Sequence, residues 1–279
     1  MTSEITTPTV QKVRPFVFES YGVIVRIDGN IQEMVDHAET VARASLLNVR
    51  DLSIRTKAEQ RFEVRRSKTR YSLYLNGEGI GSCRGRKKFL KFFDAIIRIT
   101  VGEHSPEKVF MHAGAVGWKG KGIIIPAQSF QGKSTLVSEL VRLGAEYYSD
   151  DFAIFDGKGL LHPFPRTIGM RSKDQNGYYT PYELSLDDIG GVAATVALPV
   201  GLVLLTRYES GAKWEPETLT AGQGLLEMIP FTLPLRKDPE FSMRVLKSIA
   251  TRAIIVRSPR GAAEEFAKLL LNFVDKHVN

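Results

Sequence analysis

One short run constrains the fold of this chain more than any other part of the sequence. Residues 122–125 are apolar, residues 126–132 form a loop of small and polar residues, and a helical pattern starts at Lys133. When a strand enters a helix through such a loop, backbone N–H groups turn toward one point, where the helix dipole favours negative charge. We therefore predict a phosphate-binding loop, or P-loop, followed by a helix that ends at Gly144.

The residues predicted to bind a nucleotide share this loop and the first turn of the helix. They are Ala127, Gln128, Ser129, Phe130, Gln131, Gly132, Lys133, Ser134 and Thr135. Lys133 would supply a cation for the β- and γ-phosphates, and the Ser134 hydroxyl would be a ligand for Mg²⁺. Ala127 stands where the usual pattern has its first glycine, so its φ should be negative. The alternative is a polar turn that happens to contain Gly-Lys-Ser.

Two adjacent carboxylates, Asp150 and Asp151, come at the end of the strand predicted after the P-loop helix. Strand ends of an α/β sheet converge on one crevice, so these residues should lie near the loop. One carboxylate would serve the metal directly or through water, while the other accepts a proton. Neighbouring strand residues point to opposite faces, so only one should reach an acceptor hydroxyl. A solvated Asp-Asp turn is the alternative.

His112 starts the strand that leads into the P-loop strand. If it lies across from Asp151, it could tune the proton affinity of that carboxylate or steady a phosphoryl group. The alternative is a structural histidine at a strand end.

Composition excludes several classes of protein. Of the 279 residues, 43% are hydrophobic and 25% are charged, as in ordinary globular proteins. Cys83 is the single cysteine, which excludes an internal disulfide and a multi-cysteine metal site. No apolar run approaches the ~20 residues that cross a bilayer, and the N-terminus lacks a signal-peptide pattern. We therefore expect a cytoplasmic protein with no membrane partner.

The excess of positive charge lies mainly in two segments, 61–70 and 84–91. Lys and Arg number 38 against 31 acids, for a formal charge of +7. Clustered cations can bind nucleic acid. Residues 86–97, however, place phenylalanines and isoleucines on one helical face and lysines on the other, which favours a solvated helix face. Nucleic acid is therefore not the expected partner, and attraction of an acidic protein or peptide is a third interpretation.

The pattern of residues along the chain changes after Ser105-Pro106, and this change predicts two domains, 1–105 and 106–279. The first should be a small α+β domain, with a helix capped at residues 28–30, a hairpin at Asn76-Gly77 and the basic helix. The second should be the P-loop core, with a hairpin around 119–121 and a closing helix over 262–276. Because strands outnumber helices and several are hairpin-linked, we predict an α/β fold with a mixed sheet.

Three segments together resemble a known family: Met111-His112-Ala113-Gly114, the loop 127–134, and residues 144–151. This set is similar to the catalytic domain of the HPr kinase/phosphorylase family and its related kinases, whose P-loop core resembles that of phosphoenolpyruvate carboxykinase. The resemblance covers about 106–279. It implies that His112 is an active-site residue and that Lys133 and Ser134 bind phosphate and Mg²⁺. It also implies that Asp151 is the general base, which leaves Asp150 for the metal.

The resemblance has one clear departure. HPr kinases carry a Glu-Xaa-Arg-Gly-Leu-Gly segment after the Asp pair, with a metal-binding Glu, and this chain has residues 161–169 with a different sequence there. This implies a related kinase whose substrate is not HPr. Arg166 in that segment is our candidate for a cation near the transferred phosphate, with a structural arginine as the alternative. Arg207, in a later strand-end segment that also resembles the related kinases, could contact nucleotide or substrate, with a structural role as the alternative.

The sequence thus predicts an ATP- and Mg²⁺-dependent kinase, an enzyme that transfers the γ-phosphoryl group to a hydroxyl, with Asp151 as general base. Serine or threonine of a peptide or small protein is the expected acceptor. A small-molecule kinase, an NTPase and a nucleotide-binding regulatory protein are the alternatives. The identity of the acceptor, ATP or GTP, a reverse reaction and a homo-oligomeric state, known for the family, stay open.

Overall fold

The computed structural model describes residues 13–128, 131–173 and 178–278. The chain folds into two compact units, Met1–Val101 and Gly102–Asn279. Each unit has a hydrophobic core of its own. In the described part of the chain, no helix combines the length and apolar character that crossing a membrane requires.

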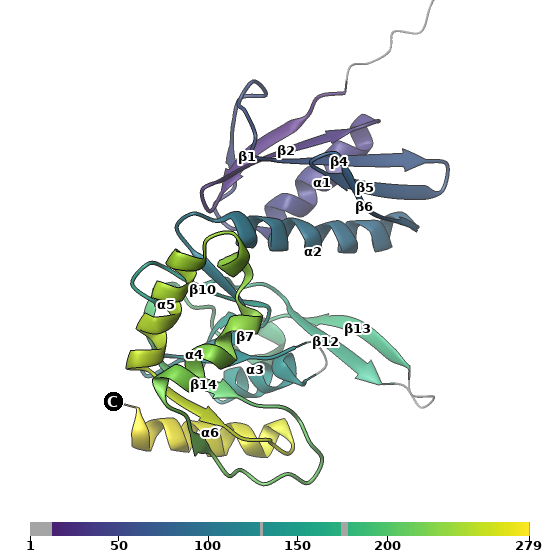
Figure 1. Ribbon diagram of the computed structural model, residues 1–279. Coiled ribbons are helices and arrows are strands. Elements are labelled where there is room, and N and C mark those ends of the chain that lie inside the picture. Colours follow the sequence, from purple (N-terminus) through teal and green to yellow (C-terminus); the bar gives the residue numbers. More distant parts are fainter. Residues whose placement is uncertain (1–12, 129–130, 174–177, 279) are drawn as a thin grey trace, which may run out of the picture. The chain divides into compact units, whose positions relative to one another are not determined.

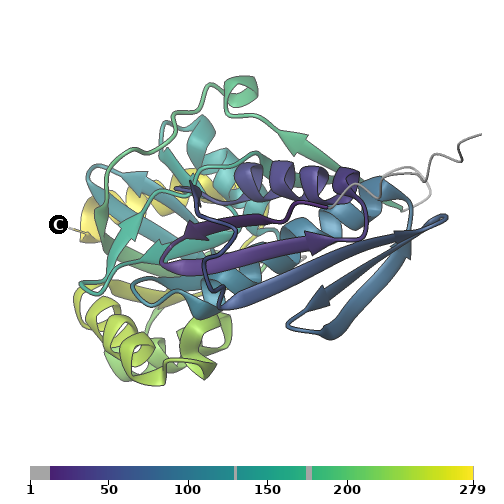
Figure 2. The ribbon, with the colours of Figure 1, turned by 90° about the horizontal axis from the view of Figure 1, so that it is seen from above.

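The N-terminal unit is a six-stranded sheet, in the order β3-β1-β2-β4-β5-β6, with two helices packed on one face (Figures 1 and 2). Phe18, Phe62 and Phe93 are among the side chains fully buried between helices and sheet. The elements are β1 (Phe16–Ser20), β2 (Val23–Gly29), α1 (Gln32–Ser45), β3 (Arg50–Asp51), β4 (Gln60–Ser67), β5 (Arg70–Leu75), β6 (Glu78–Arg84) and α2 (Arg86–His104).

Of the turn and cap predicted for this unit, the hairpin turn is confirmed and the helix cap is wrong. Asn76 and Gly77 both have positive φ, 53° and 90°, as the two-residue hairpin requires. The predicted cap of α1 is wrong, because the Asn30 side chain accepts from the Arg66 amide and donates to the Arg66 carbonyl on β4. The N-cap position is Ile31, which makes no side-chain cap bond. Asn30 therefore bonds the segment before α1 to the sheet and does not cap the N-terminus of the helix.

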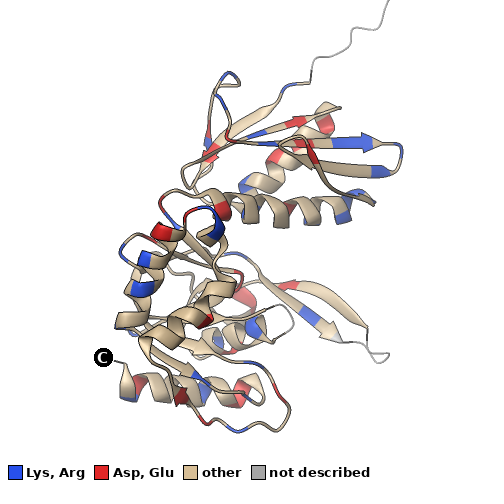
Figure 3. Cartoon of the chain, in the orientation of Figure 1, with Lys and Arg blue, Asp and Glu red and all other residues tan. Residues whose placement is uncertain are grey.

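Many of the basic side chains in this unit are paired, and Figure 3 marks charges of both signs on the same elements. Arg26 and Arg61 both contact Asp28, and Arg65 contacts Glu63. On α2 the apolar face is buried while the lysines are exposed, which is the arrangement of a solvated helix face. The exposed lysines are Lys87, Lys88 and Lys91.

The C-terminal unit is built on an eight-stranded mixed sheet, as the strand and hairpin pattern predicts. Its order is β11-β10-β7-β8-β14-β16-β15, with β9 beside β7 and an extra pairing of β11 with β14. β8, β14 and β16 are parallel, whereas β7 and β15 are antiparallel to their neighbours. The strands are β7 (Val109–Trp118), β8 (Lys121–Pro126), β9 (Glu146–Ser149), β10 (Phe152–Phe155), β11 (Leu160–His162), β14 (Leu198–Leu205), β15 (Glu217–Thr218) and β16 (Ile254–Arg257).

Helices cover both faces of this sheet (Figure 1). α3 (Lys133–Arg142) and α6 (Ala263–His277) contribute to the core on one face, and α5 (Pro239–Arg252) packs on the other with α4 (Ala221–Met228). α3 ends before Gly144, whose φ of 96° is that of a left-handed cap, as predicted. In open α/β sheets covered in this way, ligands bind outside the carboxyl ends of the parallel strands, so a site is expected at this edge.

A helix and a hairpin are among the elements of this unit that the sequence analysis does not predict. α5 begins with Asp238, whose side chain accepts from the Phe241 amide, and with Pro239 at its first position, which is a regular helix start. β12 (Ile168–Lys173) and β13 (Tyr179–Leu184) form a two-stranded hairpin of their own, which extends from the body of the unit (Figure 1). The exposed residues of β13 lack the apolar alternation that marks a half-buried strand.

Candidate active site

The segment predicted as a P-loop connects the carboxyl end of β8 to the first residue of α3, which confirms the strand and the helix predicted on its two sides. Gly132 is the N-cap of α3 and has a left-handed φ of 79°. Ala127 is buried and is not among the residues with positive φ, as the exchange of the usual glycine requires. The Gln128 N–H donates to the Gln131 side-chain oxygen at 2.9 Å. Ser129 and Phe130 lie outside the described residues.

Lys133 is a buried lysine, with only 8% of its surface exposed. Its Nζ lies 3.2 Å from His112 Nε2, which projects from β7. Burial lowers the pKa of Lys133 to about 8, and the nearby Asp150 carboxylate opposes this shift. Gly114 permits the close approach of α3 to β7, because a Cβ there would lie 2.6 Å from Val137 Cγ2 and 3.1 Å from Lys133 Cγ.

Asp150 is a buried carboxylate held by three hydrogen-bond donors. The Ser134 hydroxyl and the Gly169 N–H each donate to Oδ2 at 2.9 Å. The Tyr147 hydroxyl donates to Oδ1, also at 2.9 Å. The carboxylate is thus fixed against the first turn of α3, with Oδ2 toward the Ser134 side chain and Oδ1 toward Tyr147.

Asp151 points to a different place from its neighbour, as expected for adjacent residues at a strand end. Its Oδ1 lies 3.6 Å from His112 Nδ1, and both side chains are about one-third exposed. The Ser149 hydroxyl accepts hydrogen bonds from the backbone N–H groups of Asp151 and Phe152, which shapes the turn from β9 to β10. The β7–β10 register pairs Phe152 with His112 and so brings Asp151 beside the histidine.

The structure therefore brings together five of the predicted site residues in one row of contacts. Asp150 and Ser134 form one end, Lys133 precedes Ser134 in α3, and His112 joins Lys133 to Asp151. The histidine contacts both a lysine and a carboxylate through its two ring nitrogens.

Other predicted site residues are not part of this row of contacts. Thr135 is exposed on α3, and its carbonyl accepts from the Ser138 hydroxyl. Arg166 is half-buried, and its backbone hydrogen-bonds the Tyr147 hydroxyl that in turn holds Asp150. Arg207 is 73% exposed and lies 3.6 Å from Glu209.

Two residues that lie in this region were not predicted from the sequence. Tyr147 lies in β9 and is fully buried, with a pKa raised by burial first and by the Asp150 charge second. Arg260 follows β16 and donates to the Gly132 carbonyl at 2.7 Å. The tyrosine could have been found from its position three residues before Asp150, on the same predicted strand. The arginine could not, because its place depends on the order of strands in the sheet.

The donor set near α3 is consistent with magnesium. No three His, Cys, Asp or Glu side chains gather to hold a metal ion in the part of the chain described. Ser134 Oγ and Asp150 Oδ2 form a pair of hard oxygens 2.9 Å apart. Mg²⁺ at phosphate sites is commonly held by one or two protein oxygens, with phosphate and water as its other ligands. The residues present therefore fit Mg²⁺ better than they fit a metal that needs a full protein cage.

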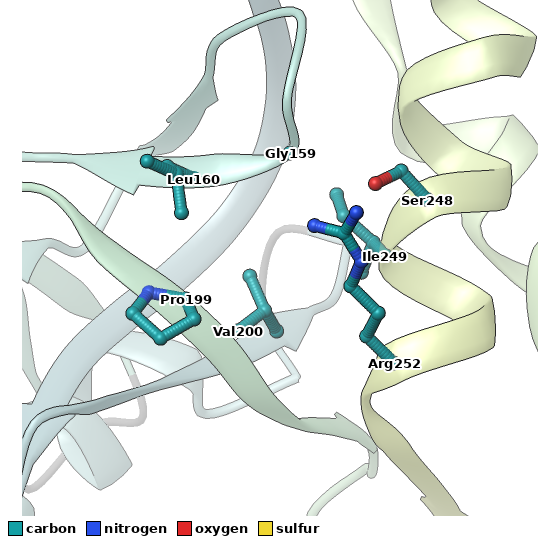
Figure 4. Close-up of a pocket in the computed structure, with 7 residues that line it drawn as sticks. All are labelled: Gly159, Leu160, Pro199, Val200, Ser248, Ile249 and Arg252. Carbon is teal, nitrogen blue, oxygen red and sulfur yellow. The ribbon is translucent and has the colours of Figure 1, made fainter.

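A small pocket lies in another part of this unit, between β11, β14 and α5 (Figure 4). Ser248 and Arg252 on α5 both donate to the Lys158 carbonyl, at 3.1 and 3.3 Å. The remaining lining is Gly159, Leu160, Pro199, Val200 and Ile249. These are mostly apolar contacts that join the helix to the sheet, and none of the predicted site residues lines the pocket.

The fold and the site define a mixed α/β protein with the predicted P-loop at the edge of its larger sheet. No known family model matches the chain, and no curated protein sequence matches it either. Among solved structures, the HPr(Ser) kinase/phosphatase from Coxiella burnetii is similar, with 12% identity and a TM-score of 0.32. The match covers 60% of this chain and 89% of that chain. A likeness at this level concerns the fold alone.

Proposed function

We propose that this protein is an ATP- and Mg²⁺-dependent kinase that phosphorylates a hydroxyl group, with Asp151 as the general base. The observation that carries the proposal is the row of contacts at the start of α3. A buried lysine, a histidine and a partly exposed carboxylate follow one another there, beside a serine fixed by a second carboxylate. Phosphoryl transfer needs these two things, neutralised phosphate charge and a base at the acceptor.

The two carboxylates have different surroundings and are assigned different roles. Asp150 is buried and accepts three hydrogen bonds, so it is suited to holding Ser134 rather than to taking up a proton. Asp151 is about one-third exposed and its side chain faces His112, so an acceptor hydroxyl can reach it. In the proposed reaction, the acceptor oxygen forms a bond to the γ-phosphorus while the bond to the β-phosphate oxygen breaks. The hydroxyl proton passes to Asp151, and ADP leaves.

Lys133 and His112 would act on the phosphate side. The lysine is at the first position of α3, where the backbone N–H groups also favour an anion. A bound phosphate would favour the charged ammonium, whose pKa is lowered by burial in the free protein. Ser134 would be the direct ligand of Mg²⁺ and Asp150 would hold it through water. The metal, when bound, neutralises charge on the transferred phosphoryl group.

The proposal is tested with the purified full chain. Binding of Mg-ATP is measured by calorimetry for the wild type, Lys133→Met and Asp151→Asn. We expect Lys133→Met to abolish measurable binding and Asp151→Asn to keep it. Transfer is then measured with γ-labelled ATP and a host extract, where Asp151→Asn should lower the rate by about 10²–10⁴-fold, the range for loss of a general base.

Matched variants control for general damage to the protein. Lys158→Met changes an exposed lysine in the turn after β10, and Asp156→Asn changes a carboxylate 3.0 Å from His162 Nε2, in a second Asp–His pair. Both should bind and react like the wild type. Unchanged ATP affinity in Lys133→Met would remove the P-loop assignment. Steady ATP hydrolysis that survives Asp151→Asn, without a labelled acceptor, would indicate an NTPase instead.

A further inference from the structure

Arg260 carries a buried positive charge that has no carboxylate partner among the described residues. The residue is 2% exposed. Its Nη2 donates to the Gly132 carbonyl at 2.7 Å, its Nη1 donates to the Gly261 carbonyl at 3.0 Å, and its Nε has no hydrogen-bond partner. The rings of Tyr208 and Phe266 lie 5.8 and 6.0 Å from the guanidinium carbon. Carbonyls and rings stabilise the cation in part, but they supply no negative charge.

The sheet topology explains why this arginine lies behind the P-loop. β8, β14 and β16 are parallel, so the residues that follow them meet at one edge of the sheet. Tyr208 follows β14, bridges to Arg260, and donates its N–H to the Gln131 carbonyl at 3.3 Å. Arg260 follows β16 and reaches Gly132. Both segments therefore hold the described end of the loop from the same edge of the sheet.

The contact with Gly132 determines the direction of one peptide unit. In a trans peptide the carbonyl and the next N–H point in opposite directions. The Gly132 carbonyl accepts from Arg260 and from the Leu136 N–H. The N–H of Lys133 therefore points the other way, out of the N-terminus of α3, which is the direction from which an anion approaches. Gly132 also has no space for a side chain, because a Cβ there would lie 2.5 Å from Arg260 Nη2.

From these observations we propose that Arg260 is a positioning residue for the phosphate site. It holds the Gly132–Lys133 peptide in the anion-binding orientation, and the phosphates of a bound nucleotide, on the other side of that peptide, offset the unpaired charge of its guanidinium through space. This inference rests on the proposed nucleotide binding, but it concerns a residue outside the P-loop. A charge effect of this kind grows with the number of phosphates on the ligand, whereas a merely structural arginine would affect all nucleotides equally.

The test compares ATP, ADP and AMP binding in the wild type, Arg260→Met and Arg260→Gln, by calorimetry. Thermal unfolding without nucleotide first checks that each variant is folded, and the glutamine variant keeps a donor where methionine has none. We expect ATP affinity to fall by at least about tenfold, ADP affinity by less, and AMP affinity by less than about twofold, given typical losses for charge-assisted hydrogen bonds. The matched control is Arg257→Met, on β16, whose guanidinium is already paired with Glu217 and Glu227.

The outcomes separate this inference from the proposed function. ATP affinity that falls no more than AMP affinity in the Arg260 variants, or an equal loss in Arg257→Met, overturns the role of Arg260 and leaves the kinase proposal standing. Nucleotide binding without phosphoryl transfer in the wild type removes the kinase proposal alone. A wild-type protein that binds no nucleotide removes both.

Discussion

The Ser134 hydroxyl donates a hydrogen bond of 2.9 Å to Asp150 Oδ2, and this bond joins the first turn of α3 to the end of β9. The two residues are sixteen positions apart in the chain. The bond directs the hydroxyl hydrogen toward the carboxylate and leaves the lone pairs of Oγ for another partner. A serine that binds Mg²⁺ beside a phosphate would do so through these lone pairs.

The first prediction concerns the magnesium dependence of nucleotide binding. Asp150→Asn removes the charge that orients Ser134, and loss of such an outer partner typically lowers metal affinity by about 10–100-fold. We therefore expect the affinity for ATP to fall by at least about tenfold in the presence of Mg²⁺ and to change little in its absence. Titration of ATP with and without Mg²⁺ measures this difference.

Asp156→Asn is the control for that experiment, because Asp156 also accepts backbone N–H bonds and lies near a histidine, but outside the row of contacts. It should keep the magnesium effect of the wild type. If Mg²⁺ raises the ATP affinity of Asp150→Asn and of the wild type by the same factor, the role of Asp150 is refuted.

The second prediction uses the pKa of Lys133, which burial lowers from 10.5 to about 8. Between these two values the unfolded chain holds a proton that the folded, ligand-free protein has released, so the free energy of unfolding rises with pH across this window. Below pH 8 the cost of the buried charge is fully present. Since one pKa unit corresponds to 1.36 kcal/mol, the whole effect is about 3 kcal/mol.

Chemical denaturation at pH 7 to 10.5 measures this effect as a difference between the wild type and Lys133→Met. The methionine side chain has a similar length and no proton to lose, so all other titrating groups cancel. The stability of the wild type relative to the variant should increase over the window. A flat difference would mean that Lys133 keeps an ordinary pKa in the folded protein.

The third prediction concerns the close packing of α3 on β7. Gly114→Ala would place a Cβ 2.6 Å from Val137 Cγ2, so the helix must move. Overpacking of this kind costs about 1–3 kcal/mol. Because the same Cβ would lie 3.1 Å from Lys133 Cγ, ATP affinity should fall as well. Denaturant unfolding and calorimetry measure the two effects.

Gly222→Ala is the matched control, since a Cβ at this position on α4 meets no atom within 4 Å. Alanine in a helix is favoured over glycine by about 1 kcal/mol, so this variant should be equally or more stable, with unchanged ATP affinity. Equal effects of the two substitutions would show that the space around Gly114 does not matter.

The fourth prediction tests the donors around Asp150. Tyr147→Phe removes the hydroxyl that donates to Oδ1 and leaves this buried acceptor without its partner. The expected loss in the free energy of unfolding is about 1–3 kcal/mol. In the control, Tyr148→Phe, the lost partner is the neutral carbonyl of Val196, so the loss should be smaller. If the control variant is the less stable of the two, Tyr147 does not support the carboxylate as described.

Local features of this molecule follow from the sequence alone. The strand, loop and helix around Gly132, the hairpin at Asn76-Gly77 and the cap at Gly144 are each determined by residues within a few positions of one another. Their backbone geometry depends on sterics and on short-range hydrogen bonds, which a sequence pattern expresses directly. The cap predicted at Asn30 failed because its side chain bonds to Arg66, thirty-six positions away.

The sequence and the tertiary structure both contribute to the description of the candidate site. The sequence identified Lys133, Ser134, Asp150 and Asp151 as candidates, because each has a motif or stands beside one. From the sequence, Asp150 is paired with Ser134 and Asp151 with His112, and the structure shows the contacts that separate them, since the turn after β9 sends adjacent side chains in different directions. Only the tertiary structure decided that Arg260 lies behind Gly132, because the neighbours of a strand depend on the burial of whole faces of the sheet. That burial is a property of the assembled core, and no short segment encodes it.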